Sequence, residues 1–217
     1  MKKSFGYKMA YFITGKVLFG IYFILTRIKF YGLGNIPKMG SVIFICNHIR
    51  NLDAPSPVFA GFKRGRYPKV FAKVNLWDVP ILKKFLTFIE AIPVERNSKK
   101  AKSSLDIAKE HLEQNEYIVI FPEGTTSKIK NGELLKFKTG AARLALSYPG
   151  VCVIPAACDF VKGRLRFCVG LPLKFDINDS VLDLTNKMSI EIDKLLKGIR
   201  QIDSENFSPK RCCGVFL

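Results

Sequence analysis

The sequence predicts an α/β fold, in which a largely parallel or mixed central sheet is covered by helices. Short apolar runs alternate with amphipathic stretches along the chain, which is the order typical of this class. The runs are too short for buried helices and too uniformly apolar for half-exposed strands, so they predict strands covered on both faces. They occupy residues 42–46, 70–72, 88–94, 117–121 and 151–158.

Helical spacing marks the stretches between and after these runs. Over residues 101–112 apolar side chains recur every three or four positions while charged ones face away, which predicts an amphipathic helix. A second such stretch covers residues 81–88. A third runs from about 180 to 200, where Ser180 and Asp183 have the spacing of a capping box. We interpret these apolar stripes as packing faces and assign them no chemistry.

The first 30 residues predict an N-terminal interfacial membrane anchor, and residues 31–217 a single domain. No acidic residue precedes Asp53, while basic residues punctuate a segment rich in Phe, Tyr, Ile and Leu. Its uninterrupted apolar run, residues 17–26, is shorter than the ~20 residues that a spanning helix needs. A signal peptide would begin similarly, but no small-residue cleavage site follows, so we expect the segment to be retained.

Composition indicates an anionic partner without identifying it. Lys and Arg number 35 against 18 Asp and Glu, a formal net charge of +17. An anionic membrane surface, an acidic carrier or substrate, and nucleic acid all suit that charge. No zinc spacing, RNA-binding aromatic signature or recognition helix is present, so we expect no nucleic-acid partner. The cysteines lie mostly in apolar runs without metal-ligand spacing, which predicts reduced thiols in the cytosol and no metal site.

Two motifs that each follow a predicted strand suggest the chemistry. His48 lies five residues before Asp53, and a carboxylate beside an imidazole fixes its tautomer and stabilises the imidazolium that forms when it takes a proton. Asp53 could instead cap a helix that begins at Pro55. The second motif is the run Phe-Pro-Glu-Gly-Thr at residues 121–125.

Further polar residues follow the other predicted strands. Lys73 comes after the second, Arg96 after the third and Glu123 after the fourth. Ligands of open α/β sheets bind beyond the carboxyl ends of strands, so these residues are expected to converge with His48 on one site. Lys73 and Arg96 are candidates for binding a phosphate.

With these motifs, the chain resembles the lysophosphatidate acyltransferase family, the 1-acylglycerol-3-phosphate O-acyltransferases among the glycerolipid acyltransferases. The resemblance spans about residues 31 to 159. Its blocks are Asn47, His48 and Asp53; residues 92–96, which end in Pro-x-x-Arg; residues 121–125 with Ser127; Lys138 to Ala142; and residues 153–156, Val-Ile-Pro-Ala.

The resemblance implies an acyltransferase domain in which His48 and Asp53 form the catalytic dyad. It implies transfer of an acyl chain from acyl carrier protein or coenzyme A to a lysophospholipid acceptor, making phosphatidate, with no other cofactor and no metal. Gly124 and Thr125 would help Glu123 to shape the acceptor site. Glu123 could instead be a structural carboxylate that caps a turn. Alternatives are an acyltransferase for glycerol 3-phosphate or another lysolipid, and a non-enzymatic basic protein that binds membranes or nucleic acid.

This sequence departs from the family pattern at two positions. The family usually has Ser where Arg50 stands and Arg where Thr126 stands. Both positions concern the acceptor, so either Arg50 replaces the missing positive charge in the phosphate site or the acceptor carries a different headgroup. With the anchor, the resemblance implies a membrane-associated enzyme whose active site faces the cytoplasm.

Overall fold

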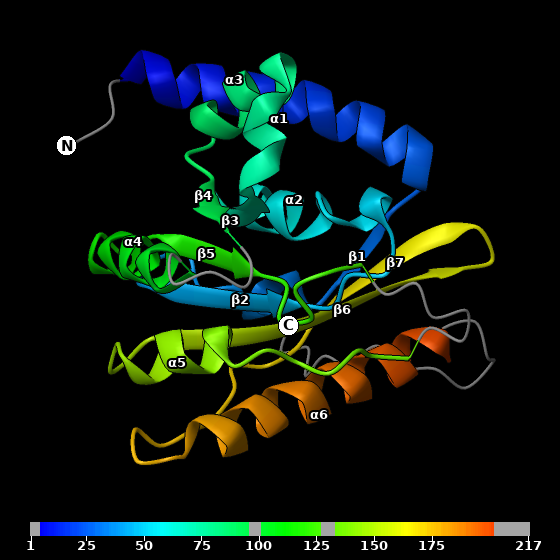
Figure 1. The fold of residues 1–217 in the computed structure, drawn as a ribbon. Helices are drawn as coiled ribbons and strands as arrows, with labels where there is room; N and C mark the ends of the chain where they lie inside the picture. Colours follow the sequence, from blue (N-terminus) through cyan, green and yellow to red (C-terminus); the bar gives the residue numbers. More distant parts are fainter. Residues whose placement is uncertain (1–4, 96–100, 127–132, 202–217) are drawn as a thin grey trace.

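The computed structural model describes residues 5–95, 101–126 and 133–201, which form a mixed seven-stranded sheet with helices on both faces (Figure 1). The strand order is β1-β7-β6-β2-β5-β3-β4. All neighbouring pairs are parallel except β6 and β7, which are antiparallel. The predicted α/β class is therefore confirmed. The strands are β1 (Lys29–Tyr31), β2 (Val42–Cys46), β3 (Pro68–Lys73), β4 (Ile92–Val94), β5 (Tyr117–Ile120), β6 (Cys152–Val161) and β7 (Arg164–Val169).

In the part of the chain that the structure describes, helices cover the sheet in two layers. Helices α1, α2 and α3 lie over one face, and α5 and α6 lie over the other, where α4 also packs (Figure 1). Their bounds are α1 (Phe5–Thr26), α2 (Ser56–Lys63), α3 (Pro80–Phe88), α4 (Ala101–Glu113), α5 (Gly140–Leu146) and α6 (Val181–Arg200). Short 3-10 helices lie between some of them: η1 (Leu33–Asn35), η2 (Asn51–Asp53) and η3 (Val74–Asp78).

The central strand β2 shows why the apolar runs are uninterrupted. Ile43 and Ile45 pack in the cluster shared with α4, α5 and α6, whereas Val42 and Phe44 pack in the cluster shared with α1 and α2. All four side chains are fully buried. Since successive side chains point to opposite faces, a strand covered on both faces needs apolar residues at every position.

The edges of the sheet differ from the sequence-based expectation. Most of the run at 88–94 is not strand, because α3 continues to Phe88 and only Ile92–Val94 pairs with β3. Strands β1 and β7 were not predicted. The β7 run contains Arg164 and Arg166, and β1 has only three residues. Because β1 pairs with β7, the sheet begins inside the segment expected to be the anchor.

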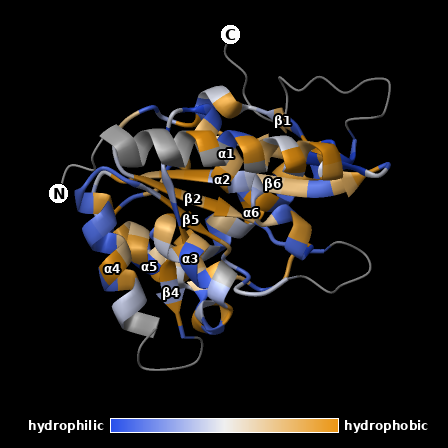
Figure 2. Ribbon diagram, turned by 90° about the horizontal axis from the view of Figure 1, so that it is seen from above, coloured by the Kyte–Doolittle hydropathy of each residue, from blue (hydrophilic) through white to orange (hydrophobic). Residues whose placement is uncertain are grey.

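Helix α1 lies on the outside of the first helical layer. Figure 2 shows the strands coloured as hydrophobic where α1 and α2 cover them. Several apolar side chains of α1 are exposed, and Ile24 and Leu25 are exposed by 75% and 66%. Among the residues that the structure describes, no helix has the combination of length and hydropathy that a bilayer crossing requires.

The cysteines follow the expectation only in part. Cys46 and Cys158 are free and buried, and Cys152 is free and half-buried. Cys168 is disulfide-bonded, so the prediction of reduced thiols is wrong at this position.

Candidate active site

His48 and Asp53 lie in the loop that connects β2 to α2. The Nδ1 atom of His48 lies 2.5 Å from Oδ1 of Asp53. With Nδ1 directed at a carboxylate, the opposite ring atom, Nε2, remains to accept a proton. The predicted pair therefore has the geometry that a general base requires.

The loop folds around Asp53, whose carboxylate is only 1% exposed. Its second oxygen, Oδ2, accepts hydrogen bonds of 2.7 Å from the backbone N–H groups of Ile49 and Arg50. The α2 helix begins at Ser56, so Asp53 does not cap it; Asp53 is instead the last residue of η2. The alternative reading of Asp53 as the cap of this helix is wrong.

Asn47, the residue before His48, attaches the loop to the neighbouring strand. It is fully buried, donates to the carbonyl of Cys158 at 3.0 Å and accepts from the N–H of Cys158 at 2.8 Å. This two-way hydrogen bond joins the residue that follows β2 to Cys158 within β6, directly before the imidazole. His48 is thus held at the carboxyl end of the central strand.

Glu123, in the second motif, holds His48 from another side. Its Oε1 accepts from the backbone N–H of His48 at 2.8 Å, and its Oε2 accepts from the N–H of Leu135 at 2.9 Å. The side chain is 3% exposed, and burial raises the pKa of its carboxyl group, an effect that the two N–H donors partly oppose. Of the two roles predicted for Glu123, shaping the acceptor site and acting as a structural carboxylate, these two hydrogen bonds favour the structural one. The carboxylate therefore holds the loop in place.

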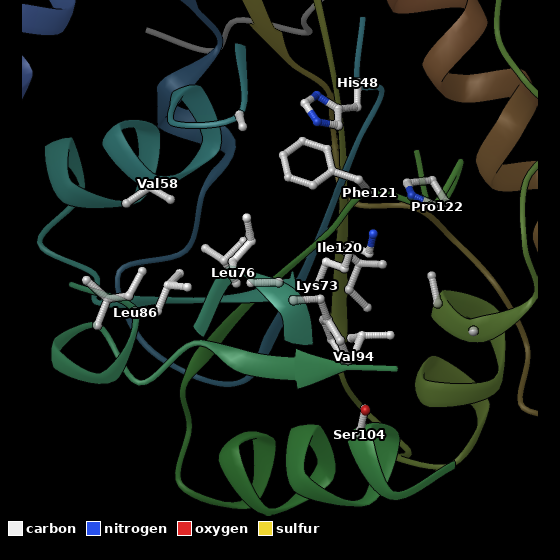
Figure 3. A pocket seen from close by; sticks show the side chains of 18 of the residues that line it. His48, Val58, Lys73, Leu76, Leu86, Val94, Ser104, Ile120, Phe121 and Pro122 are labelled. Atoms are coloured by element: carbon white, nitrogen blue, oxygen red, sulfur yellow. The ribbon is translucent and has the colours of Figure 1, made fainter. Parts of the chain in front are cut away.

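A cavity of about 840 Å³ opens beside the imidazole (Figure 3). His48 lies at one end, with its ring centroid 4.6 Å from that of Phe121. Most of the lining is apolar and includes Val58, Leu76 and Leu86, which Figure 3 shows away from the histidine. A long apolar pocket with few polar groups at one end suits a ligand with a hydrocarbon chain and a polar reacting group.

Charged residues of only one sign line this cavity within the described part of the chain. They are Lys73, Lys138 and Arg143. Lys73 was predicted to belong to the site, and Gly124 and Thr125 also line the cavity as expected. Lys138 belongs to a block that the sequence analysis noted without a role, whereas Arg143 was missed.

The remaining predicted site residues are not in the described lining. The guanidinium carbon of Arg50 lies 5.2 Å from the centre of the Phe160 ring, outside the cavity. Arg96 lies outside the described residues, as does Ser127, so their expected roles stay predictions.

A second histidine shows that a carboxylate five residues away does not make a site. The Nδ1 atom of His111 lies 2.6 Å from Oε2 of Glu116, at the same spacing along the chain as His48 and Asp53. His111 lies in the last turn of α4 and Glu116 directly before β5, both outside the described lining of the cavity. The position beyond a strand's carboxyl end and beside the cavity distinguishes His48.

Comparisons with known proteins agree with this geometry. A family model described as Acyltransferase matches residues 27–159, more than half of the chain. The chain is similar to a 1-acyl-sn-glycerol-3-phosphate acyltransferase of Borreliella burgdorferi, with 28% identity over 85% of this chain and 74% of the relative. It is 33% identical to an enzyme of the same name from Helicobacter pylori, over 57% of this chain and 51% of that relative.

Two further matches show the range of similar proteins. A lyso-glycine lipid O-acyltransferase of Bacteroides thetaiotaomicron is 23% identical over 76% of this chain and 61% of its own length. The crystal structure of a 1-acyl-sn-glycerophosphate acyltransferase from Thermotoga maritima superimposes with a TM-score of 0.68 and 23% identity, over 91% of this chain and 80% of that one. At that identity the structural match supports the fold.

Proposed function

This chain belongs to the acyltransferase family, and we propose that it transfers an acyl chain from a thioester to the free hydroxyl of 1-acylglycerol 3-phosphate, making phosphatidate. The donor would be acyl-acyl carrier protein or acyl-coenzyme A. The observation that carries the proposal is the oriented His48–Asp53 pair at the polar end of a large apolar cavity. The names of the Borreliella and Helicobacter relatives support the choice of acceptor.

In this mechanism Nε2 of His48 removes the proton from the acceptor hydroxyl while the hydroxyl oxygen attacks the thioester carbonyl carbon. The carbon–sulfur bond then breaks, and the thiolate that leaves takes the proton from the imidazolium. Asp53 stabilises the imidazolium from the removal of the proton until its transfer to the thiolate. The ester forms in one displacement sequence, and the enzyme returns to its starting state.

The thiols of this chain do not suit an acyl-enzyme route. Cys46 and Cys158 are the free cysteines beside the catalytic loop, and both are buried and absent from the described cavity lining. Burial raises the pKa of Cys46, and the neighbouring Cys46 thiol and burial raise that of Cys158. A protonated, inaccessible thiol is a poor nucleophile, which supports direct attack by the acceptor.

We further propose that the enzyme works on an anionic membrane surface with its active site facing the cytoplasm. Exposed apolar side chains of α1, η3 and α3, including Ile24, Val74 and Phe85, support the membrane part. Lys83 and Lys84 of α3 are exposed among them. Apolar groups flanked by cations bind anionic lipid surfaces.

Thr126 favours a second class of acceptor. Thr126 is uncharged where the family usually has Arg, and the Bacteroides relative is named for a lyso-glycine lipid. Glycerol 3-phosphate or a lysolipid with another headgroup would then be the acceptor.

Acyl transfer by purified enzyme in mixed micelles tests the function. Both donors would be offered with 1-acylglycerol 3-phosphate, glycerol 3-phosphate and lysolipids that lack a phosphate monoester. We expect phosphatidate to form fastest, and His48→Ala to reduce the rate by about 10² to 10⁴ because the general base is lost. The matched control is His111→Ala, which removes the other histidine–carboxylate pair and should retain the wild-type rate. Equal rates for the two variants would refute His48 as the base.

Asp53→Asn tests the dyad itself. The amide oxygen would stay with the N–H groups of Ile49 and Arg50, which places the amide NH₂ opposite Nδ1 of His48. The proton of the neutral ring would then sit on Nε2, where it blocks base action. We expect kcat to fall by orders of magnitude, with an unchanged circular dichroism spectrum. A variant with near wild-type kcat would show that Asp53 has no part in catalysis.

A further inference from the structure

The charges around the cavity indicate a site for an anion. Three cationic side chains, Lys73, Lys138 and Arg143, line it, and no Asp or Glu belongs to the described lining. A hydrocarbon chain gains nothing from these cations. An unbalanced group of cations beside an apolar pocket instead favours an anionic group on the same ligand.

Lys138 is the cation most closely attached to the loop that holds the catalytic histidine. Its backbone N–H donates to the carbonyl of Pro122 at 2.8 Å. Its side chain lies along Gly124, so close that a Cβ placed on Gly124 would be 3.2 Å from the Lys138 Nζ and 2.9 Å from its Cε. Glu123, next to Gly124, binds the backbone N–H of His48. The ammonium group and the imidazole are therefore positioned by one loop.

The Lys138 ammonium is available for a ligand. Within the described ranges no carboxylate forms an ion pair with it, whereas Lys187, Lys194 and Lys197 all have Asp or Glu partners. Arg143, one turn along α5, donates from Nε to the Thr139 hydroxyl at 3.2 Å, which leaves its terminal nitrogens for other acceptors.

We propose that Lys138, assisted by Arg143, binds the phosphate monoester of the acceptor lipid and so places the neighbouring hydroxyl at His48; this inference rests on the proposed function. In 1-acylglycerol 3-phosphate the free hydroxyl and the phosphate are on adjacent carbons, so a phosphate bound beside the loop brings the hydroxyl to the base. In a thioester donor the phosphates lie at the far end of the pantetheine arm. The acceptor therefore fits the position of Lys138 better than the donor does.

Steady-state kinetics of Lys138→Ala against Lys136→Ala tests this assignment. Lys136 is exposed, lies two residues earlier, carries the same charge and does not line the cavity. We expect Lys138→Ala to raise the acceptor KM about tenfold, since a charged hydrogen bond to phosphate is lost at a partly solvated position. The donor KM should stay constant, Lys136→Ala should resemble wild type, and Lys138→Arg should retain most of the affinity.

Inhibition by glycerol 3-phosphate gives a second measurement with a defined probe. The inhibition should be about tenfold weaker in Lys138→Ala than in wild type, and glycerol should inhibit neither protein. A donor KM that rises instead of the acceptor KM would assign Lys138 to the donor, and equal acceptor KM values in the two alanine variants would exclude it from substrate binding. Either result overturns the inference.

The same probe separates this inference from the proposed function. If wild-type enzyme transferred no acyl chain to any acceptor, the proposed function would fail. Calorimetric binding of glycerol 3-phosphate to wild type and to Lys138→Ala would still decide whether Lys138 binds a phosphate monoester. Equal binding by the two proteins would count against the site.

Discussion

At the scale of single residues, two buried carboxylates hold one histidine. Asp53 orients the ring of His48 from one side, and Glu123 accepts a hydrogen bond from its backbone N–H on the other. Each carboxylate also uses its second oxygen on further backbone N–H groups. The imidazole is therefore held in place without a substrate, so that little reorganisation would be needed if His48 acts as the proposed base.

Glu123 should also make stability depend on pH. Burial raises its folded-state pKa above that of the unfolded chain, so its contribution to stability is fully present below the unfolded pKa and is lost as pH rises through the folded one. Relative to Glu123→Gln, wild type should therefore lose free energy of unfolding as pH rises through this window. Urea unfolding of both proteins from about pH 4 to about pH 8 measures the difference. If the difference in free energy of unfolding between the two proteins did not change with pH, the raised pKa of Glu123 would not contribute to stability.

At the scale of elements, the Tyr22 side chain attaches α1 to the loop that carries His48 and Asp53. The Tyr22 hydroxyl donates to the carbonyl of Leu52 at 2.8 Å and lies 2.8 Å from the hydroxyl of Ser56. These two residues flank the segment that contains Asp53. Tyr22 is 6% exposed, and its ring centroid lies 5.1 Å from that of Phe59 in α2. The position of the outer helix is therefore coupled to that of the dyad.

Tyr22→Phe should lower kcat about two- to tenfold, because one or two hydrogen bonds that hold the loop are lost while the ring packing remains. The acceptor KM should change little, since Tyr22 does not line the cavity. Tyr148→Phe, between α5 and β6, is the matched control. An unchanged kcat in Tyr22→Phe would show that the loop keeps its geometry without α1.

At the scale of the whole molecule, exposed apolar residues gather on the layer that holds α1 and α3. Leu76 of η3 and Phe85 of α3 are partly exposed and also line the cavity. A lipid acceptor held by this surface could therefore reach the cavity without passing through water. Helix α6 lies on the opposite face of the sheet (Figure 1).

A pair of equally exposed isoleucines tests the proposed binding of the α1 face to membranes. Ile21 of α1 and Ile190 of α6 are both 54% exposed. Ile21→Glu should weaken binding to vesicles that contain phosphatidylglycerol about tenfold or more, because it removes apolar contact and adds like charge. Ile190→Glu should bind as wild type does. Co-sedimentation with vesicles measures both, and equal losses in the two variants would place the membrane surface elsewhere.

The sequence by itself determined the buried strands, the amphipathic helices and the pairing of His48 with Asp53. Each of these depends on neighbours in the chain, because apolar periodicity and short loops can be recognised from a few consecutive residues. β2, α4 and the loop of His48 and Asp53 have such local patterns and were predicted. The three-residue β1 and the β7 run, which contains two arginines, lack an uninterrupted apolar pattern and were missed.

Only the tertiary structure decided what surrounds the dyad. Glu123 accepts a hydrogen bond from the backbone of His48, which lies 75 residues earlier in the chain. Lys138, just before α5, and Arg143, in α5, line the cavity beside His48. Arg50, next to the dyad in sequence, turns instead to Phe160. The physical reason is that the order of strands in the sheet, which no local pattern encodes, determines which distant loops meet at its carboxyl edge.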